Sequence, residues 1–146
     1  MKLSMDIVLE EYSKLLAKGT CYIWQDGKLI HDFPILSGGH GRGYLDLGEY
    51  SIRGLSTPEK VAKMPNPKPY QTDGYGFAFP MTPLFETNRT GIWMHPDGNI
   101  PGSLGCIVWT QSKTFNEILY ELVKTAISIQ GTIPVSVRDT ISTVSN

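Results

Sequence analysis

Reactive side chains are scarce in this sequence of 146 residues. It has two cysteines, three histidines, and 13 Lys and Arg against 14 Asp and Glu, for a formal net charge of -1. The balanced charge and the lack of an aromatic RNA-binding motif argue against a nucleic-acid partner. Two cysteines are too few for a disulfide scaffold, although one bond between Cys21 and Cys106 stays open. Cysteine content therefore leaves the compartment undecided.

The sequence also lacks long apolar runs, repeats and low-complexity tracts. No segment approaches the roughly 20 apolar residues of a membrane span. Asp6, Glu10, Glu11 and Lys14 interrupt the apolar region that a signal peptide would need, so we expect synthesis in the cytoplasm without one. With 40% hydrophobic and 18% charged residues, the chain is typical of one globular domain over residues 1–146.

Apolar periodicity divides the first part of the chain into a helix and strands. Residues 1–19 have apolar side chains at helical spacing, with Ser4 placed to cap the helix and Gly19 to end it. Residues 20–36 alternate between apolar and polar around Asp26-Gly27, a dipeptide favoured in tight hairpins. Further short strands are expected at residues 47–55, 77–85, 90–95, 107–109 and 132–138.

A second helix is expected between the last two strands. Thr114 and Glu117 have the spacing of a capping box, and Gly131 is placed to end the helix. Its apolar face consists of Phe115, Ile118, Leu119, Leu122, Val123, Ala126 and Ile127. The pattern predicts a mainly β fold with flanking helices (α+β), in which a mostly antiparallel sheet is backed by two helices.

Residues 56–76 contain four prolines and few apolar side chains. A long segment without regular structure inside one domain is often a functional lid, and equally often a solvated connector. The sequence leaves both interpretations open.

The stretch MHPDGNIPGSLGCIVW, residues 94–109, contains both a histidine and a cysteine. A cysteine is nucleophilic as the thiolate, and a nearby imidazole can take its proton, which makes Cys106 and His95 a candidate catalytic pair. Gly102, Ser103 and Gly105 allow a turn whose backbone N–H groups, up to Cys106 itself, form an oxyanion hole. The structural alternative is a buried cysteine at a strand start and a histidine without a function.

These residues resemble a known family. HPDGNIPGSLGCI, followed by a helix and GTIPVSV, is similar to the catalytic segment of the L,D-transpeptidase (YkuD-type) cysteine enzymes of peptidoglycan. The resemblance extends over residues 20–138 and includes the hairpins and the strand around Gly48 to Tyr50. It implies a β-sandwich or barrel in which Cys106 is the nucleophile and His95 its partner. The carbonyl of Pro96 or Asp97, or the hydroxyl of Ser103, would orient the imidazole.

The resemblance implies a peptidoglycan stem peptide as substrate, with no cofactor or metal. Attack on the carbonyl next to a terminal D-alanine would form an acyl-enzyme, with the oxyanion held by backbone N–H groups of Gly105 and Cys106. Water, a free D-amino acid or a second stem then decides between hydrolysis, exchange and cross-linking. Trp93 and Arg42 are the candidate substrate contacts, although Arg42 also fits a solvated turn.

Two positions depart from the usual family motif. Leu104 and Val108 stand where the family has a second histidine and an arginine. The remaining pattern, His followed by Gly-Ser-any-Gly-Cys, is more similar to the small branch of type VI secretion effectors and phage proteins. That branch implies delivery to the periplasm or cell wall by a lysis pathway, a virion or a secretion system. An immunity protein or a secretion or lysis partner is then expected.

Three other functions remain open on the sequence. A phage-type peptidoglycan endopeptidase or endolysin would use the same pair. A zinc D,D-peptidase would use His40, Asp46 and His95 and leave Cys106 without a role. A non-catalytic wall-binding module would use aromatic side chains such as Trp24 and Trp109 as a stacking surface.

Overall fold

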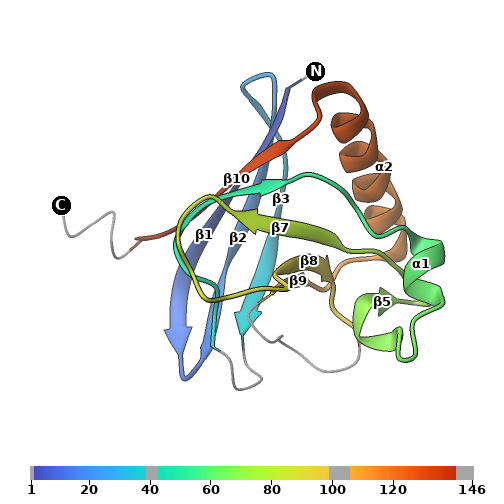
Figure 1. Ribbon diagram of the computed structural model, residues 1–146, viewed down its shortest axis with the longest axis horizontal. Helices are drawn as coiled ribbons and strands as arrows, with labels where there is room; N and C mark the ends of the chain where they lie inside the picture. The colour runs from blue at the N-terminus through green and yellow to red at the C-terminus, as the bar shows by residue number, and fades with distance from the viewer. Residues whose placement is uncertain (1, 39–42, 99–105, 141–146) are drawn as a thin grey trace.

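Eight strands close into a mixed β-barrel in the computed structural model, which describes residues 2–38, 43–98 and 106–140 (Figure 1). In order around the barrel, the strands are β1 Leu3–Ser13, β10 Ile133–Asp139, β4 Gly48–Ile52, β7 Phe79–Pro83, β8 Trp93–Pro96, β9 Ile107–Trp109, β3 Lys28–Gly38 and β2 Leu16–Gln25. The pairs β1·β10 and β8·β9 are parallel, and the other neighbours are antiparallel.

The helix expected over residues 1–19 is wrong, because this segment forms β1 and the start of β2. The helical spacing depended on the adjacent apolar pair Val8 and Leu9, and both are buried in the strand as well. β1 pairs with β2 on one edge and with β10 on the other, which satisfies its backbone groups on both sides. The turn after β1 places Leu15 at a φ of 57°, a conformation that no helix contains.

The hairpin predicted around Asp26-Gly27 is confirmed. β2 and β3 are joined by these two residues, which have φ values of 52° and 81°. Positive φ at both positions matches the twist of the flanking strands. The strands predicted around residues 47–55, 77–85, 90–95, 107–109 and 132–138 are present as β4, β7, β8, β9 and β10.

The predicted second helix is confirmed as α2, Lys113–Gln130, but its cap is different. The Ser112 hydroxyl accepts a hydrogen bond from the Phe115 N–H at 3.1 Å, so the helix begins before the expected Thr114 cap. Gly131 ends the helix with a φ of 84°. The buried face of α2 contributes Leu119, Tyr120, Val123 and Ala126 to the core.

Residues 56–76 are not structureless. They contain α1 Pro58–Ala62, the single 3-10 turn η1 Lys68–Tyr70, and the short strands β5 Gln71–Thr72 and β6 Tyr75–Gly76. Thr57 caps α1, since its hydroxyl accepts from the Lys60 N–H at 3.2 Å. α1 and α2 are therefore the two flanking helices, and the first of them is not the one that the periodicity indicated.

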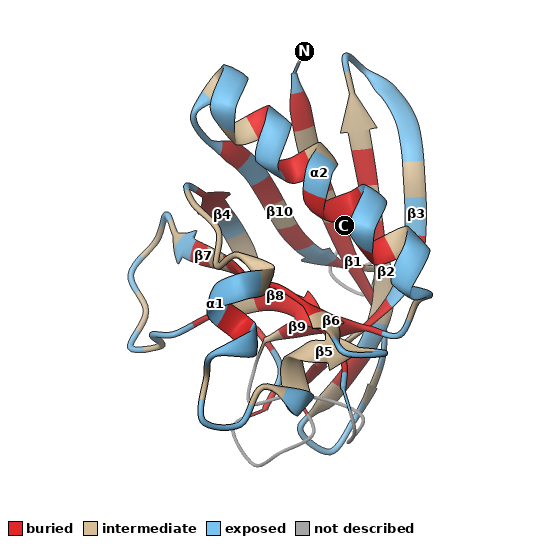
Figure 2. Ribbon diagram, turned by 90° about the vertical axis from the view of Figure 1, so that its right-hand side faces the viewer, coloured by how far each residue is buried: buried red, intermediate tan, exposed pale blue. Residues whose placement is uncertain are grey.

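The core fills the barrel and the space beneath α2. Figure 2 shows the buried residues of α2 on the side that faces the strands. The predicted mainly β fold with flanking helices is confirmed, in the form of a closed barrel. Neither helix in the described part of the chain has the length and apolar character required to cross a bilayer.

Candidate active site

The parallel strands β8 and β9 bring residues 93–96 and 107–109 side by side. Their register aligns Met94 with Ile107 and His95 with Val108, and Cys106 directly precedes β9. Met94 and Ile107 belong to the core, so His95 and Val108 lie on the other face of the strand pair. The Trp93 backbone hydrogen-bonds to the Cys106 thiol, which places Cys106 beside the start of β8, the strand that contains His95.

His95 is a buried, neutral imidazole in a defined tautomer. Its side chain is 5% exposed, and its Nδ1 lies 2.8 Å from the carbonyl oxygen of Pro96. A carbonyl only accepts hydrogen bonds, so Nδ1 carries the proton and Nε2 keeps its lone pair. Burial lowers the pKa of His95 to about 4, and the hydrogen bond to Pro96 opposes this shift. At neutral pH the ring is therefore a base with a fixed orientation.

Tyr70, the last residue of η1, packs over the imidazole of His95. Its ring centroid lies 4.6 Å from that of His95 and 5.8 Å from that of Trp93. Burial raises the pKa of Tyr70, and the negative charge of a Cys106 thiolate raises it further. Tyr70 is thus close to both members of the candidate pair.

The chain around Tyr70 is packed tightly onto the end of β8. The Thr72 hydroxyl donates to the Asp97 carbonyl at 3.2 Å. A Cβ on Gly98 would lie 1.8 Å from the Lys68 carbonyl oxygen, so only glycine allows this approach. Of the two interpretations of residues 56–76, this part of the segment matches a cover over the site better than a solvated connector.

Cys106 is a half-buried thiol without a disulfide. Its sulfur donates a long hydrogen bond to the Gly91 carbonyl at 3.8 Å. Burial raises the pKa of the Cys106 thiol, while a hydrogen bond from the Trp93 backbone and the positive charge of Arg89 lower it. The net effect of burial is therefore to favour the neutral thiol in the free protein.

The pKa shifts of His95 and Cys106 determine what this pair can do chemically. A raised thiol pKa and a lowered imidazole pKa both favour the neutral pair over a preformed thiolate–imidazolium ion pair. The Nε2 lone pair can still take the thiol proton as the sulfur attacks an electrophile. The arrangement suits a nucleophile that is activated during the reaction.

The other predicted site residues divide into two groups. Trp93 lies on β8 beside Tyr70, as a substrate contact near the pair would. Ser103, Gly105 and Arg42 lie outside the described residues, as do Leu104 and His40.

The sequence did not indicate three residues that contact or influence the pair. Tyr70 reaches it from η1, and Gly91 and Arg89 reach it from the connection between β7 and β8; only the cluster of prolines beside Tyr70 marked one of these segments as unusual. Among the orienting groups that the sequence left open, the Pro96 carbonyl is the observed partner of Nδ1.

The zinc set proposed from the sequence has one member outside the described residues, His40. Asp46 accepts a hydrogen bond from the Thr87 hydroxyl at 3.0 Å and lies 3.9 Å from Arg89. In residues 2–38, 43–98 and 106–140, no three His, Cys, Asp or Glu side chains are grouped so as to hold a metal ion.

The fold and the site define a class of protein: a mixed β-barrel with a histidine on one strand and a cysteine directly before the adjacent parallel strand. Residues 15–135 match the L,D-transpeptidase catalytic domain, the YkuD family. The chain belongs to this family, and its family implies an L,D-transpeptidase-type enzyme that modifies peptidoglycan. Neither a curated protein nor a solved structure matches the chain.

Proposed function

We propose that Cys106 is the nucleophile and His95 the general base of an enzyme that acts on peptidoglycan stem peptides. The observation that carries the proposal is that Tyr70 lies close to both side chains, with Nδ1 of His95 held by the Pro96 carbonyl. This arrangement leaves Nε2 as the basic nitrogen of a buried ring. Family membership supplies the substrate class.

The proposed reaction begins with transfer of the thiol proton of Cys106 to Nε2 of His95. The sulfur attacks the carbonyl carbon of the L-centred residue before a terminal D-alanine, and backbone N–H groups at Gly105 and Cys106 stabilise the oxyanion. Collapse of the tetrahedral intermediate breaks the C–N bond, and His95 returns the proton to the amine of D-alanine. The product is a thioester that water, a D-amino acid or a second stem amine then cleaves.

Val108 bears on the choice of acceptor. It is fully buried on β9, beside His95 in the register, and occupies the position where the usual family motif has an arginine. An apolar side chain there provides no charge for orienting a second stem. We therefore propose that hydrolysis and exchange are as favoured as cross-linking. We also propose that the protein belongs to the small branch found in type VI effectors and phage proteins. It would act in the cell wall after delivery.

Mass spectrometry of defined muropeptides tests this proposal. Wild-type protein is expected to release D-alanine, to exchange it or to form dimers, depending on the acceptor supplied. Cys106→Ala should abolish every product, whereas Cys21→Ala, which removes the other, fully buried thiol, should retain them. Products that persist in Cys106→Ala, or activity that a chelator abolishes and a thiol alkylator does not, would contradict the proposed nucleophile.

A further inference from the structure

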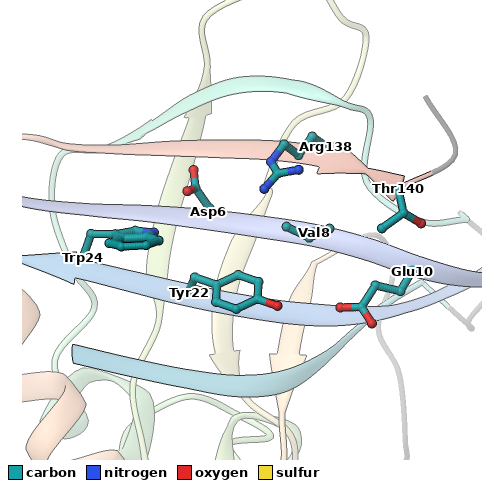
Figure 3. A pocket seen from close by; sticks show the side chains of 7 residues that line it. All are labelled: Asp6, Val8, Glu10, Tyr22, Trp24, Arg138 and Thr140. Carbon is teal, nitrogen blue, oxygen red and sulfur yellow. The ribbon is translucent and has the colours of Figure 1, made fainter. Parts of the chain in front are cut away.

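A groove crosses the outer surface of the barrel on the wall formed by β1, β2 and β10 (Figure 3). Its volume is about 410 Å³. It is lined by Asp6, Val8 and Glu10 of β1, Tyr22 and Trp24 of β2, Arg138 of β10, and Thr140 just after β10. Three strands separate β1 from β8 in either direction around the barrel, so the groove lies on the wall opposite the candidate active site.

The strand registers explain why these side chains gather. Tyr22 is paired with Asp6, and Val8 with Arg138, so aromatic, acidic and basic residues project from one face. Their neighbours in sequence, such as Cys21 and Ile23, point into the core. Val8 is only 5% exposed although it faces outward, so it forms an apolar floor between charged side chains.

The groove has two aromatic rings along one side. Tyr22 and Trp24 are two residues apart on β2, and Figure 3 shows them side by side along that strand. The indole nitrogen of Trp24 is buried without a hydrogen-bond partner among the described residues. A buried unpaired N–H is costly, and a ligand oxygen that reached it after a small side-chain shift would remove that cost.

The polar groups suit a ligand without strong charge. Asp6 and Glu10 oppose Arg138, and the Glu10 carboxylate already accepts from the Thr20 hydroxyl at 2.8 Å. Within the described part of the chain, neither Asp6 nor Arg138 forms an ion pair. A carboxylate and a guanidinium that are both available can accept from and donate to neutral hydroxyl and amide groups.

A pyranose ring combines these properties. Its C–H faces pack against the electron-rich faces of aromatic rings, and its edges carry hydroxyl and acetamido groups. We propose that the groove binds the glycan strand of peptidoglycan, an N-acetylhexosamine polymer, separately from the stem peptide at Cys106. This inference rests on the proposed function, which supplies peptidoglycan as the polymer. The groove would keep the enzyme on the wall while the opposite face acts on stems.

Isothermal titration calorimetry with a peptide-free tetramer of N-acetylglucosamine tests the proposal. Wild type and Cys106→Ala should bind alike, because the groove is remote from the thiol. Trp24→Ala should weaken binding about tenfold, as expected for loss of one stacked ring. Arg138→Gln should also weaken binding, and this variant provides the test if Trp24→Ala has a lowered melting temperature. Ile129→Ala, a truncation of an exposed apolar side chain on α2, is the control and should bind like wild type.

Turnover separates this inference from the proposed function. Trp24→Ala and Arg138→Gln should act on a soluble muropeptide as wild type does, and should lose activity only on intact sacculi. The groove proposal is overturned if the sugar tetramer does not bind, if both variants bind it normally, or if a sugar-free stem peptide binds the groove instead. Loss of all activity in Cys106→Ala with normal sugar binding supports both proposals, and unchanged activity in Cys106→Ala overturns only the proposed nucleophile.

Discussion

The two cysteines sit in two unlike walls of the same barrel. Cys21 lies in β2, between β1 and β3, and these three strands have 10 or 11 residues each. Cys106 directly precedes β9, which pairs with β8, and these strands have only 3 and 4 residues. Cys21 is fully buried among apolar side chains, whereas Cys106 is half-buried close to Tyr70.

The difference shows what strand length does to a reactive side chain. A long strand pairs its backbone along its whole length and encloses every inward side chain, so burial raises the pKa of Cys21 without providing a base. A short strand leaves backbone groups near its ends outside the strand pairing. The carbonyls of Gly91 and Pro96 are therefore available to the thiol and the imidazole. The short-strand wall is therefore the part of the barrel suited to chemistry.

Replacement of His95, the proposed base, should have the largest effect on activity and so separate the two walls most clearly. His95→Gln keeps a polar side chain but provides no lone pair of comparable basicity, and we expect turnover of a muropeptide to fall about 1000-fold. His31→Gln, on the long strand β3, is the control and should stay within about twofold of wild type. Steady-state kinetics on one defined substrate measures both. Similar losses in the two variants would mean that the short-strand wall has no special role.

Thiol reactivity compares the two walls directly. Because burial raises the pKa of Cys106, its alkylation by iodoacetamide should accelerate about tenfold per pH unit from pH 7 to 9. Cys21 should stay unmodified in the folded protein. Peptide mass spectrometry of timed samples gives both rates. A rate for Cys106 that is already maximal at pH 6 would indicate a preformed ion pair instead of a neutral one.

Stability at acid pH reports on the buried imidazole. The pKa of His95 is about 4 in the folded protein and about 6.5 in the unfolded chain, so the unfolded state binds more protons between these values. Stability should thus be highest above pH 6.5 and fall by about 3 kcal/mol as the pH drops to 4. Urea unfolding across this range measures the slope. His95→Gln should reduce that slope, and an unchanged slope would place the ring in water.

The close approach of η1 to β8 can be tested with two glycines. Gly98→Ala would push a Cβ against the Lys68 carbonyl and should cost about 2 kcal/mol of unfolding free energy while displacing the cover over His95. Gly54→Ala has open space around its Cβ and an ordinary φ, so it should change stability by less than about 0.5 kcal/mol. Chemical denaturation compares the two. Equal effects would show that the approach at Gly98 is not tight.

Replacement of Tyr70, whose ring packs over His95, should have the smallest effect of these changes. Tyr70→Ala should let water reach the imidazole, and the pKa of His95 should rise from about 4 toward its ordinary value because desolvation causes the shift. Tyr70→Phe keeps the ring and should leave the pKa unchanged. Titration of the histidine resonances by NMR follows both variants. A pKa that stays low in Tyr70→Ala would assign the burial to other side chains.

Local signals in the sequence were sufficient for some elements and misleading for others. Asp26-Gly27 specified its hairpin because positive φ at two consecutive positions is rare outside such turns. Helical spacing of apolar residues predicts a helix in the N-terminal segment, and the adjacent pair Val8 and Leu9 fits that spacing better than strand alternation. In the barrel both are buried, one toward the core and one beneath the groove side chains, and alternation alone does not reveal a strand covered on both faces.

The candidate site shows the same division. The sequence by itself determined which side chains are candidates for the chemistry: one thiol and one imidazole in a stretch rich in glycine and proline that resembles the catalytic segment of the L,D-transpeptidase family. Only the tertiary structure decided their state. The parallel pair β8·β9 brings the two segments together, the Pro96 carbonyl selects the tautomer, and Tyr70 packs on the imidazole from η1. Desolvation depends on neighbours that are distant in sequence, so no local pattern encodes it.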